Sequence, residues 1–251
     1  MKNIGICLLS TNIYFLLGLR FIHKWNKHYK GNSNITFYLF ADRDPCLYLE
    51  KQNVVYIYSK NDSWVDGTNS KFTNIIKLKD TKEDNLYYFD ADTNISKDFT
   101  DEWYLGDLVG GQHYADQDRM KNIKCFDRNP NSEAYVPLDT DLPETYYYGA
   151  FFGGTKDRVV DLCKTLYGYQ QADKKINYEP SVNDESYINK EFHYNPPTKV
   201  VKSSDFEFDI SDKGGLDNTR NTEICFNKEL SMIKENKNKP FDIKKGEIFF
   251  I

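Results

Sequence analysis

The chain has 251 residues, of which 16% are aromatic and 28% are charged, and its formal net charge is −5. This aromatic content is too high for a disordered chain, and the lack of a basic excess argues against nucleic acid as the partner. No run of about 18 apolar residues occurs, so we expect no membrane span. The short apolar start is followed directly by polar Ser10 and Thr11 without a cleavage signal, which is typical of a first β-strand rather than a secretion signal.

The cysteines predict free thiols. They are odd in number, scattered, and without the Cys-x-x-Cys spacing of a zinc site. They are Cys7, Cys46, Cys125, Cys163 and Cys225. Together with the lack of a signal sequence, they favour a reducing compartment, and we expect a cytoplasmic protein.

Predicted strands alternate with predicted helices through the first 92 residues. The expected strands are 3–9, 35–40, 54–58 and 86–89, and the expected helices are 14–28 and 69–79. This alternation predicts βαβ units with right-handed crossovers and a mostly parallel sheet. Neither of the glycine-rich phosphate motifs, GxGxxG or GxxxxGK[ST], is present, which argues against dinucleotide and P-loop sites.

The strand at 86–89 is followed directly by two carboxylates, Asp90 and Asp92. Its continuous apolar and aromatic run is typical of an inner strand that is covered on both faces. Ligands of such sheets bind beyond the carboxyl ends of the strands. Two carboxylates there would suit a hard divalent cation that also contacts substrate phosphates. The same spacing occurs elsewhere, so the pair by itself does not distinguish a metal site from a solvated loop; the other pairs are Asp42/Asp44, Asp116/Asp118 and Asp139/Asp141.

The second half of the chain has a different pattern. A strand and loop are expected within 106–113, an aromatic strand with internal glycines at 146–154, a helix at 156–169 and a strand at 199–201. A further helix, with Asn183 as its N-cap, must end near Tyr194 because a Pro-Pro pair follows. The chain from residue 203 is polar, and we expect it to be mobile. No convincing linker occurs, so we predict one domain over 1–251, with a first half organised like a nucleotide-binding fold (1–92), a second half (93–202) and a C-terminal segment (203–251).

Four segments of the chain, in order, resemble glycosyltransferase family six, the family of the ABO blood-group transferases and the α-1,3-galactosyltransferases. They are the strand ending in Asp-x-Asp at 86–92, the region of 128–137 and 146–154, the Asp-Glu-Ser helix at 183–190, and the basic segment at 228–234. The resemblance runs from about residue 3 to residue 236. It implies a GT-A fold, in which a Rossmann-like, mostly parallel sheet is merged with an acceptor-binding region. In such a fold, 93–202 would be the donor-sugar and acceptor half. It also implies a retaining transfer of galactose or N-acetylgalactosamine from a UDP-sugar to a glycan acceptor, forming an α-1,3 linkage.

The resemblance assigns roles around the reacting sugar. It implies that Asp90 and Asp92 hold Mn²⁺ or Mg²⁺, and that Asp184 hydrogen-bonds the donor sugar. Glu185 matches either a nucleophile or a stabiliser of an oxocarbenium-like transition state, and the sequence does not separate these roles. Without the resemblance, acids in a helix's first turn are explained by the helix dipole alone.

Further donor contacts are implied at both ends of the chain. Leu9 and Tyr14 fall in the uridine pocket, where Tyr14 either stacks on the base or is a core residue of a helix start. Lys71 stands where the family has an arginine that contacts both the donor and a metal carboxylate, and lysine lacks the arginine fork. Lys228 and Lys234 match basic residues that close over the pyrophosphate, although lysines in such a segment are also typical of a solvated tail.

Donor and acceptor choice are implied by a few positions. Tyr148, Gly149 and Ala150 would contact the donor sugar, and alanine at 150 favours UDP-galactose over the N-acetylated sugar for steric reasons. His113 and Asn183 would contact the acceptor. The family's Trp-His pair before Asp-Glu is Val182-Asn183 here, so we expect an acceptor different from that of the mammalian members. The chain resembles the short bacterial and viral members, which have no stem or membrane anchor.

Two other interpretations remain open. One is a GT-A transferase that uses another donor, such as UDP-glucose. The other is a non-catalytic carbohydrate-binding protein, whose aromatic side chains would stack on sugar rings and whose acidic pair would hold calcium.

Overall fold

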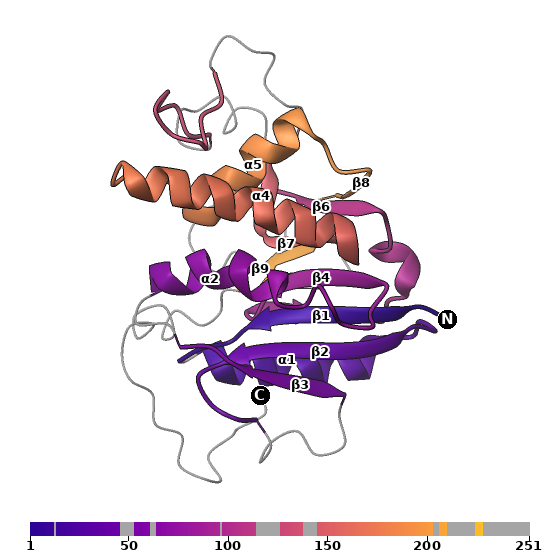
Figure 1. Cartoon of the computed structure of the whole chain (residues 1–251). Helices are drawn as coiled ribbons and strands as arrows, with labels where there is room; N and C mark the ends of the chain where they lie inside the picture. The colour runs from indigo at the N-terminus through magenta and orange to yellow at the C-terminus, as the bar shows by residue number, and fades with distance from the viewer. Residues whose placement is uncertain are drawn as a thin grey trace.

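The computed structural model describes residues 1–12, 14–45, 53–60, 64–95, 97–113, 126–137, 145–202, 206–209 and 224–227. Its centre is a seven-stranded sheet in the order β3-β2-β1-β4-β7-β6-β8 (Figure 1). Within this sheet β7 runs antiparallel to both of its neighbours, and the other pairs are parallel. The strands are β1 (Asn3–Leu9), β2 (Asn34–Ala41), β3 (Val54–Tyr58), β4 (Asn85–Asp90), β6 (Leu108–Gln112), β7 (Tyr147–Thr155) and β8 (Lys199–Val201). The predicted α/β class with a mostly parallel sheet is confirmed, and the architecture is GT-A-like.

Helices cover both faces of the sheet. The α-helices are α1 (Tyr14–His28), α2 (Trp64–Ile76), α4 (Lys156–Lys175) and α5 (Asn183–Tyr194), and η1 (Asp101–Trp103) is a short 3₁₀-helix. Alternate residues of β1 point to opposite faces. Ile6 and Leu8 pack with Phe21 of α1, whereas Cys7 packs with residues of α2 and α4. Consecutive residues of β1 are therefore buried on both faces, as expected for an inner strand of a sheet that is covered on two sides.

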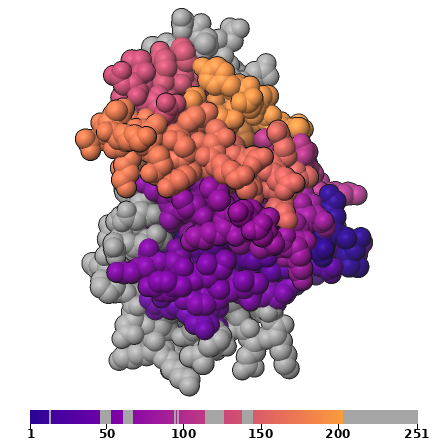
Figure 2. All heavy atoms as spheres, viewed as in Figure 1, coloured from indigo at the N-terminus to yellow at the C-terminus, as the bar shows by residue number. Residues whose placement is uncertain are grey.

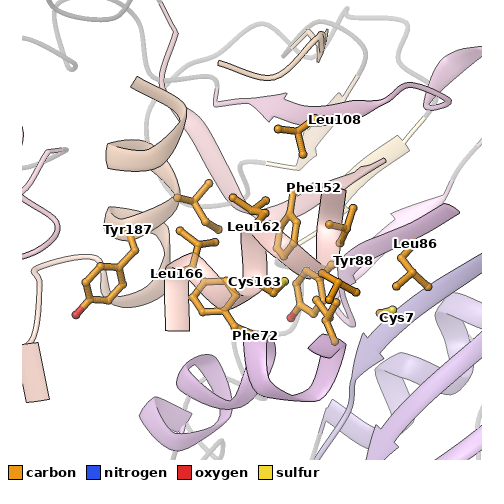
Figure 3. Close-up of a cluster of buried hydrophobic side chains, with 14 of the residues drawn as sticks. Cys7, Phe72, Leu86, Tyr88, Leu108, Phe152, Leu162, Cys163, Leu166 and Tyr187 are labelled. Atoms are coloured by element: carbon orange, nitrogen blue, oxygen red, sulfur yellow. The ribbon is translucent and has the colours of Figure 1, made fainter. Parts of the chain in front are cut away.

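The cluster on the second face joins the two halves of the sequence. Phe72 of α2 and Phe152 of β7 lie 6.3 Å apart between ring centroids, and Cys163 of α4 and Tyr187 of α5 belong to the same cluster (Figure 3). In the space-filling view the purple residues of the first half meet the orange helices directly (Figure 2). Because α5 shares this core with α2 and α4, its start is held over the edge of the sheet.

Several elements differ from the prediction. α2 begins five residues before the expected start, and α4 continues to Lys175 instead of ending at Tyr169. A second sheet, in the order β5-β10-β9, was not predicted. Its strands are β5 (Thr93–Ile95), β9 (Phe206–Asp209) and β10 (Ile224–Asn227), and the last two lie in the segment for which no strand was expected.

Two predictions from composition can be compared with the structure. Cys7 and Cys163 are buried free thiols. In the residues that the structure describes, no helix is both long and apolar enough to cross a membrane.

Candidate active site

The candidate site lies where the carboxyl ends of β1 and β4 meet the beginning of β7 and the first turn of α5. Leu9, at the end of β1, is the register partner of Asp90, at the end of β4. Asp92 follows in the turn after β4. Asp184 and Glu185 are in the first turn of α5, more than 90 residues along the chain. The fold therefore brings both predicted acidic pairs to the same edge of the sheet.

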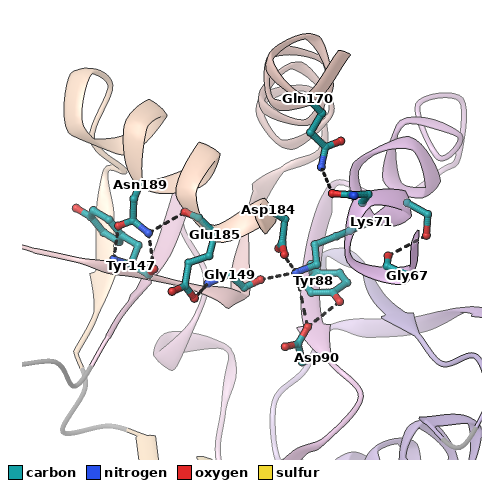
Figure 4. A network of polar contacts seen from close by, with 12 residues as sticks. Gly67, Lys71, Tyr88, Asp90, Tyr147, Gly149, Gln170, Asp184, Glu185 and Asn189 are labelled. Carbon is teal, nitrogen blue, oxygen red and sulfur yellow. Dashed lines mark hydrogen bonds and ion pairs between the residues drawn. The ribbon is translucent and has the colours of Figure 1, made fainter. Parts of the chain in front are cut away.

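Lys71 of α2 connects these elements. Its side chain is 3% exposed, and its ammonium donates hydrogen bonds to Asp184 Oδ2 at 2.5 Å and to the Gly149 carbonyl at 2.8 Å (Figure 4). The same nitrogen lies 3.7 Å from Asp90 Oδ1 and 4.4 Å from the centre of the Tyr88 ring. A buried cation requires such partners, because an unpaired charge in the interior is very costly. Lys71 thus joins α2, β4, β7 and α5 at one point.

Glu185 is held on the backbone of β7. Its Oε2 accepts a 2.7 Å hydrogen bond from the N–H of Gly149. A Cβ added at Gly149 would lie 3.0 Å from Glu185 Cβ and 3.1 Å from Asp184 Oδ2. Glycine at position 149 therefore lets the start of α5 approach the strand closely, which is a common reason for glycine inside a strand.

Burial and neighbouring charges shift the pKa values of the ionisable groups in the site. Burial raises the pKa of Glu185 to about 7, and the charge of Asp184 adds to this, while the Gly149 hydrogen bond opposes it. Burial lowers the pKa of Lys71, but Asp184 and Asp90 outweigh burial and raise it. Burial also raises the pKa of Asp184, against the influence of Lys71. The site therefore holds the Lys71 cation beside a carboxyl group, Glu185, whose pKa lies near neutral pH.

Asn189 fixes the position of α5. Its side chain accepts a hydrogen bond from the Tyr147 N–H at 2.7 Å and donates to the Tyr147 carbonyl at 2.8 Å, so it pairs with the strand backbone. It also donates to the Glu185 carbonyl at 2.9 Å. Asn189 lies one turn after Glu185 on the same face of the helix. Its side chain therefore ties the turn that carries Glu185 to β7.

The prediction that Asn183 is the N-cap of this helix is wrong. α5 begins at Asn183, the capping position is Val182, and no side chain makes a cap hydrogen bond there. Asn183 has a φ of 44°, in the left-handed region that asparagine tolerates better than most residues. Its N–H donates to the Pro180 carbonyl at 3.0 Å, and its side chain is half-buried beside the acidic pair.

Of the predicted sugar-contacting residues, Gly149 contacts Glu185, and Tyr148 and Ala150 flank Gly149 in β7. Tyr148 is buried, and its ring centre is 4.2 Å from that of His113. The His113 N–H also donates to the Tyr146 carbonyl at 2.6 Å. Ala150 is half-buried and packs against the core on the α1 side of the sheet. The predicted acceptor residue His113 and the predicted donor residue Tyr148 are thus direct neighbours.

The two residues predicted to contact uridine lie at the end of β1 and the start of α1. Tyr14 is the first residue of α1, is half-buried, and donates its N–H to the Thr11 carbonyl at 3.1 Å. Leu9 is half-buried and packs against the cluster beneath α2. Lys228 and Lys234 lie outside the described residues, so their closure over the pyrophosphate stays a prediction.

The acidic residues at this edge fit a divalent cation that is shared with a phosphate. Asp90 is 38% exposed, and its Oδ2 makes no hydrogen bond or ion pair to any described residue. The ammonium of Lys71 faces three carboxylates, which are Asp184, Asp90 and Glu185. Within the described ranges, no group of three or more His, Cys, Asp or Glu could hold a metal ion by itself. Two carboxylates that complete their coordination with substrate phosphates are, however, a usual arrangement for Mg²⁺.

Two residues of the site were not predicted from the sequence. Tyr88, whose hydroxyl donates to Asp90 Oδ1 at 2.7 Å, was assigned only to the hydrophobic strand. Asn189 was part of a matched segment but received no role. The sequence indicated Asn189 only as a polar residue one turn after Glu185. Its partner, Tyr147 of β7, is 42 residues away in the sequence, so local patterns could not reveal the contact.

Comparison with known proteins shows a family match over most of the chain. The family model described as "Glycosyltransferase family 6" matches residues 2–234. The O-antigen biosynthesis glycosyltransferase WbnI of Escherichia coli is 28% identical over 168 residues, which are 64% of this chain and 69% of that protein. Histo-blood group ABO system transferase 2 of Rattus norvegicus is 26% identical over 208 residues, 79% of this chain and 61% of the relative. Globoside alpha-1,3-N-acetylgalactosaminyltransferase 1 of Mus musculus is 30% identical over 212 residues, which are 79% of this chain and 59% of that protein. The chain thus spans about three fifths of the length of these two mammalian relatives.

Proposed function

Because the chain belongs to glycosyltransferase family 6, we propose that it is a retaining, metal-dependent transferase that moves galactose from UDP-galactose to a glycan acceptor in an α-1,3 linkage. The family implies a nucleotide-sugar donor and a glycan acceptor. The names of the rat and mouse relatives describe a blood-group transferase and an α-1,3-N-acetylgalactosaminyltransferase. One observation carries the proposal for this chain: Lys71 and Gly149 hold Asp184 and Glu185 beside Asp90, at the edge where ligands of parallel sheets bind.

In this proposal the residues of α5 act on the sugar. The Asp184 carboxylate, whose Oδ2 is paired with Lys71, accepts a hydrogen bond from a sugar hydroxyl. Glu185, with Oε2 fixed by the Gly149 N–H, lies beside the anomeric carbon. When the bond from this carbon to UDP breaks, the Glu185 carboxylate stabilises the positive charge that develops, either by ionic contact or by forming a covalent bond. Both routes lead to retention, because the acceptor hydroxyl then attacks on the face that UDP left. Its proton passes to the departing diphosphate, and in the covalent route the bond to Glu185 breaks as the new glycosidic bond forms.

The second task of the site is to neutralise the negative charge that builds up on the departing UDP. Asp90 and Asp92 would hold Mn²⁺ or Mg²⁺, which when bound would neutralise the leaving diphosphate as a Lewis acid. The buried ammonium of Lys71 keeps Asp90 and Asp184 in place from the protein interior, where it is protected from solvent. We expect Lys228 and Lys234 to add positive charge over the pyrophosphate and to exclude water.

The donor sugar is proposed to be galactose because the family resemblance implies that the Ala150 side chain takes the space that a 2-acetamido group needs. A screen of UDP-sugars, read as UDP release, should show a preference for UDP-galactose over UDP-N-acetylgalactosamine. Ala150→Gly should shift the ratio of kcat/KM values towards the acetamido sugar by about 5- to 150-fold, as expected when crowding in a close-packed site is relieved. The ratio is measured on one preparation, so the amount of folded enzyme does not affect it. A wild-type preference for the acetamido sugar, or for UDP-glucose, would contradict the assignment of galactose.

A further inference from the structure

Asp90 is held by only one of its two carboxylate oxygens. The hydroxyl of Tyr88 donates to Oδ1 at 2.7 Å, and the Lys71 ammonium lies 3.7 Å from the same atom (Figure 4). No hydrogen bond or ion pair joins Oδ2 to the part of the chain that the structure describes. The two partners are buried, at 4% and 3% exposure, whereas Asp90 is 38% exposed. One oxygen therefore faces the protein interior, and the other remains available on the solvent side.

The position of the Tyr88 hydroxyl is fixed by packing. Tyr88 and Asp90 are two residues apart in β4, so their side chains leave the same face of the sheet. The Tyr88 ring stacks on Phe152 of the neighbouring strand, with centroids 5.5 Å apart. The Lys71 ammonium covers the ring at 4.4 Å. A phenol held between β7 and α2 cannot follow the carboxylate if Asp90 rotates, so its hydroxyl defines one orientation for Asp90.

We propose that Tyr88 is a positioning residue for cation binding: by fixing Oδ1, it presents Oδ2 of Asp90 to the ion as a single oxygen ligand. This inference rests on the metal site of the proposed function. A ligand that is oriented before the ion arrives loses little rotational freedom on binding, and partners of metal ligands commonly affect affinity for this reason. At Oδ1, Lys71 contributes a positive charge and Tyr88 contributes a directional hydrogen bond. A single arginine could supply both kinds of contact through its planar guanidinium, which lysine lacks.

The test is the affinity of the full-length chain for Mn²⁺ in the presence of UDP, measured from the electron paramagnetic resonance signal of free Mn²⁺. Tyr88→Phe keeps the ring and its stacking but removes the hydroxyl, and we expect Mn²⁺ to bind about 10- to 100-fold more weakly. The matched control is Tyr169→Phe, because Tyr169 donates to the Glu191 carboxylate at 2.8 Å outside the site. This control should bind Mn²⁺ as the wild type does.

A second readout separates positioning from general destabilisation. With Tyr88→Phe, the Mn²⁺ concentration for half-maximal UDP release should rise, and kcat at saturating Mn²⁺ should return close to the wild-type value. If Tyr88→Phe binds Mn²⁺ normally while Asp90→Ala does not, the role of Tyr88 is refuted and the metal site stands. If Asp90→Ala also binds Mn²⁺ normally, the metal site itself is refuted. A structure of the wild type with Mn²⁺ and UDP gives an answer that needs no variant: a two-oxygen contact from Asp90, or a broken Tyr88 hydrogen bond, would overturn the proposal.

Discussion

Replacing Glu185 with glutamine is expected to lower kcat by at least about 100-fold while the protein stays folded. Glutamine keeps the size of the side chain, and its oxygen can still accept the hydrogen bond from the Gly149 N–H. It cannot provide the negative charge that stabilises a developing oxocarbenium ion, a kind of electrostatic contribution that typically amounts to about 10²–10³ in kcat. Turnover of UDP-galactose at saturating donor measures the effect, and donor affinity should change much less than kcat.

The matched control for this variant is Glu191→Gln. Glu191 is in the same helix, but its carboxylate accepts hydrogen bonds from Tyr169 and Asn195, away from the site. Its replacement should leave turnover within a few fold of the wild type. Near-normal turnover of Glu185→Gln would show that Glu185 only stabilises the start of α5.

The pKa of Glu185 adds a pH signature. Because the carboxylate is the active form and its pKa is raised to about 7, wild-type kcat/KM should fall as the pH drops below about 7. The folded state favours the protonated form, so the stability contributed by Glu185 is fully present below its ordinary pKa of 4.5 and is lost as the pH rises through 7. Glu185→Gln should therefore have a Tm at pH 8 equal to or above that of the wild type, with the difference shrinking towards pH 5. A Tm clearly below the wild type at pH 8 would contradict this account of its burial.

Removal of either carboxylate after β4 is expected to have the second large effect. Asp90→Ala or Asp92→Ala should reduce UDP release in Mn²⁺ by about 100- to 1000-fold, which corresponds to the several kcal/mol that a Lewis acid supplies to a leaving phosphate. For Asp90 the loss also removes one of the two carboxylates that form ion pairs with Lys71. Activity is measured over a range of Mn²⁺ concentrations.

An exposed acid of similar type serves as the control for these variants. Asp161 pairs with Lys164 on the surface of α4, with its side chain 73% exposed. Asp161→Asn should leave UDP release unchanged at all metal concentrations. Full activity of Asp90→Ala, or of the wild type in excess EDTA, would contradict a role for the pair in catalysis.

The sheet and the acidic edge could be predicted because they follow from local patterns. The four residues before Asp90, at 86–89, are all hydrophobic, which indicates burial on two sides, and strand direction then places Asp90 and Asp92 at the ligand-binding edge. The predicted helix limits were less accurate where local helix propensity and tertiary packing oppose each other. Gly67 near the start of α2 disfavours helix locally. In α4, Gly168 also disfavours helix locally, but beyond it the buried side chains of Gln170 and Asp173 bond to neighbouring elements and hold the helix in place.

The contacts inside the site could not be predicted from local patterns. Lys71 and Asp184 are 113 residues apart, and only the packing of α2 against α5 brings them together. Tyr88 fits the hydrophobic pattern of its strand, so nothing in the sequence indicates that its hydroxyl reaches Asp90. The strands β9 and β10 have four residues each, too few to show a clear alternation.

The central claim is that this edge of the sheet binds a uridine diphosphate together with a divalent cation, and calorimetric titration of UDP tests it most directly. In Mn²⁺ the full-length chain should bind one UDP, more than about tenfold more tightly than in EDTA. Asp90→Ala should abolish this difference. A chain that binds no UDP in Mn²⁺, but binds free glycans in calcium, would be a carbohydrate-binding protein and would contradict the transferase.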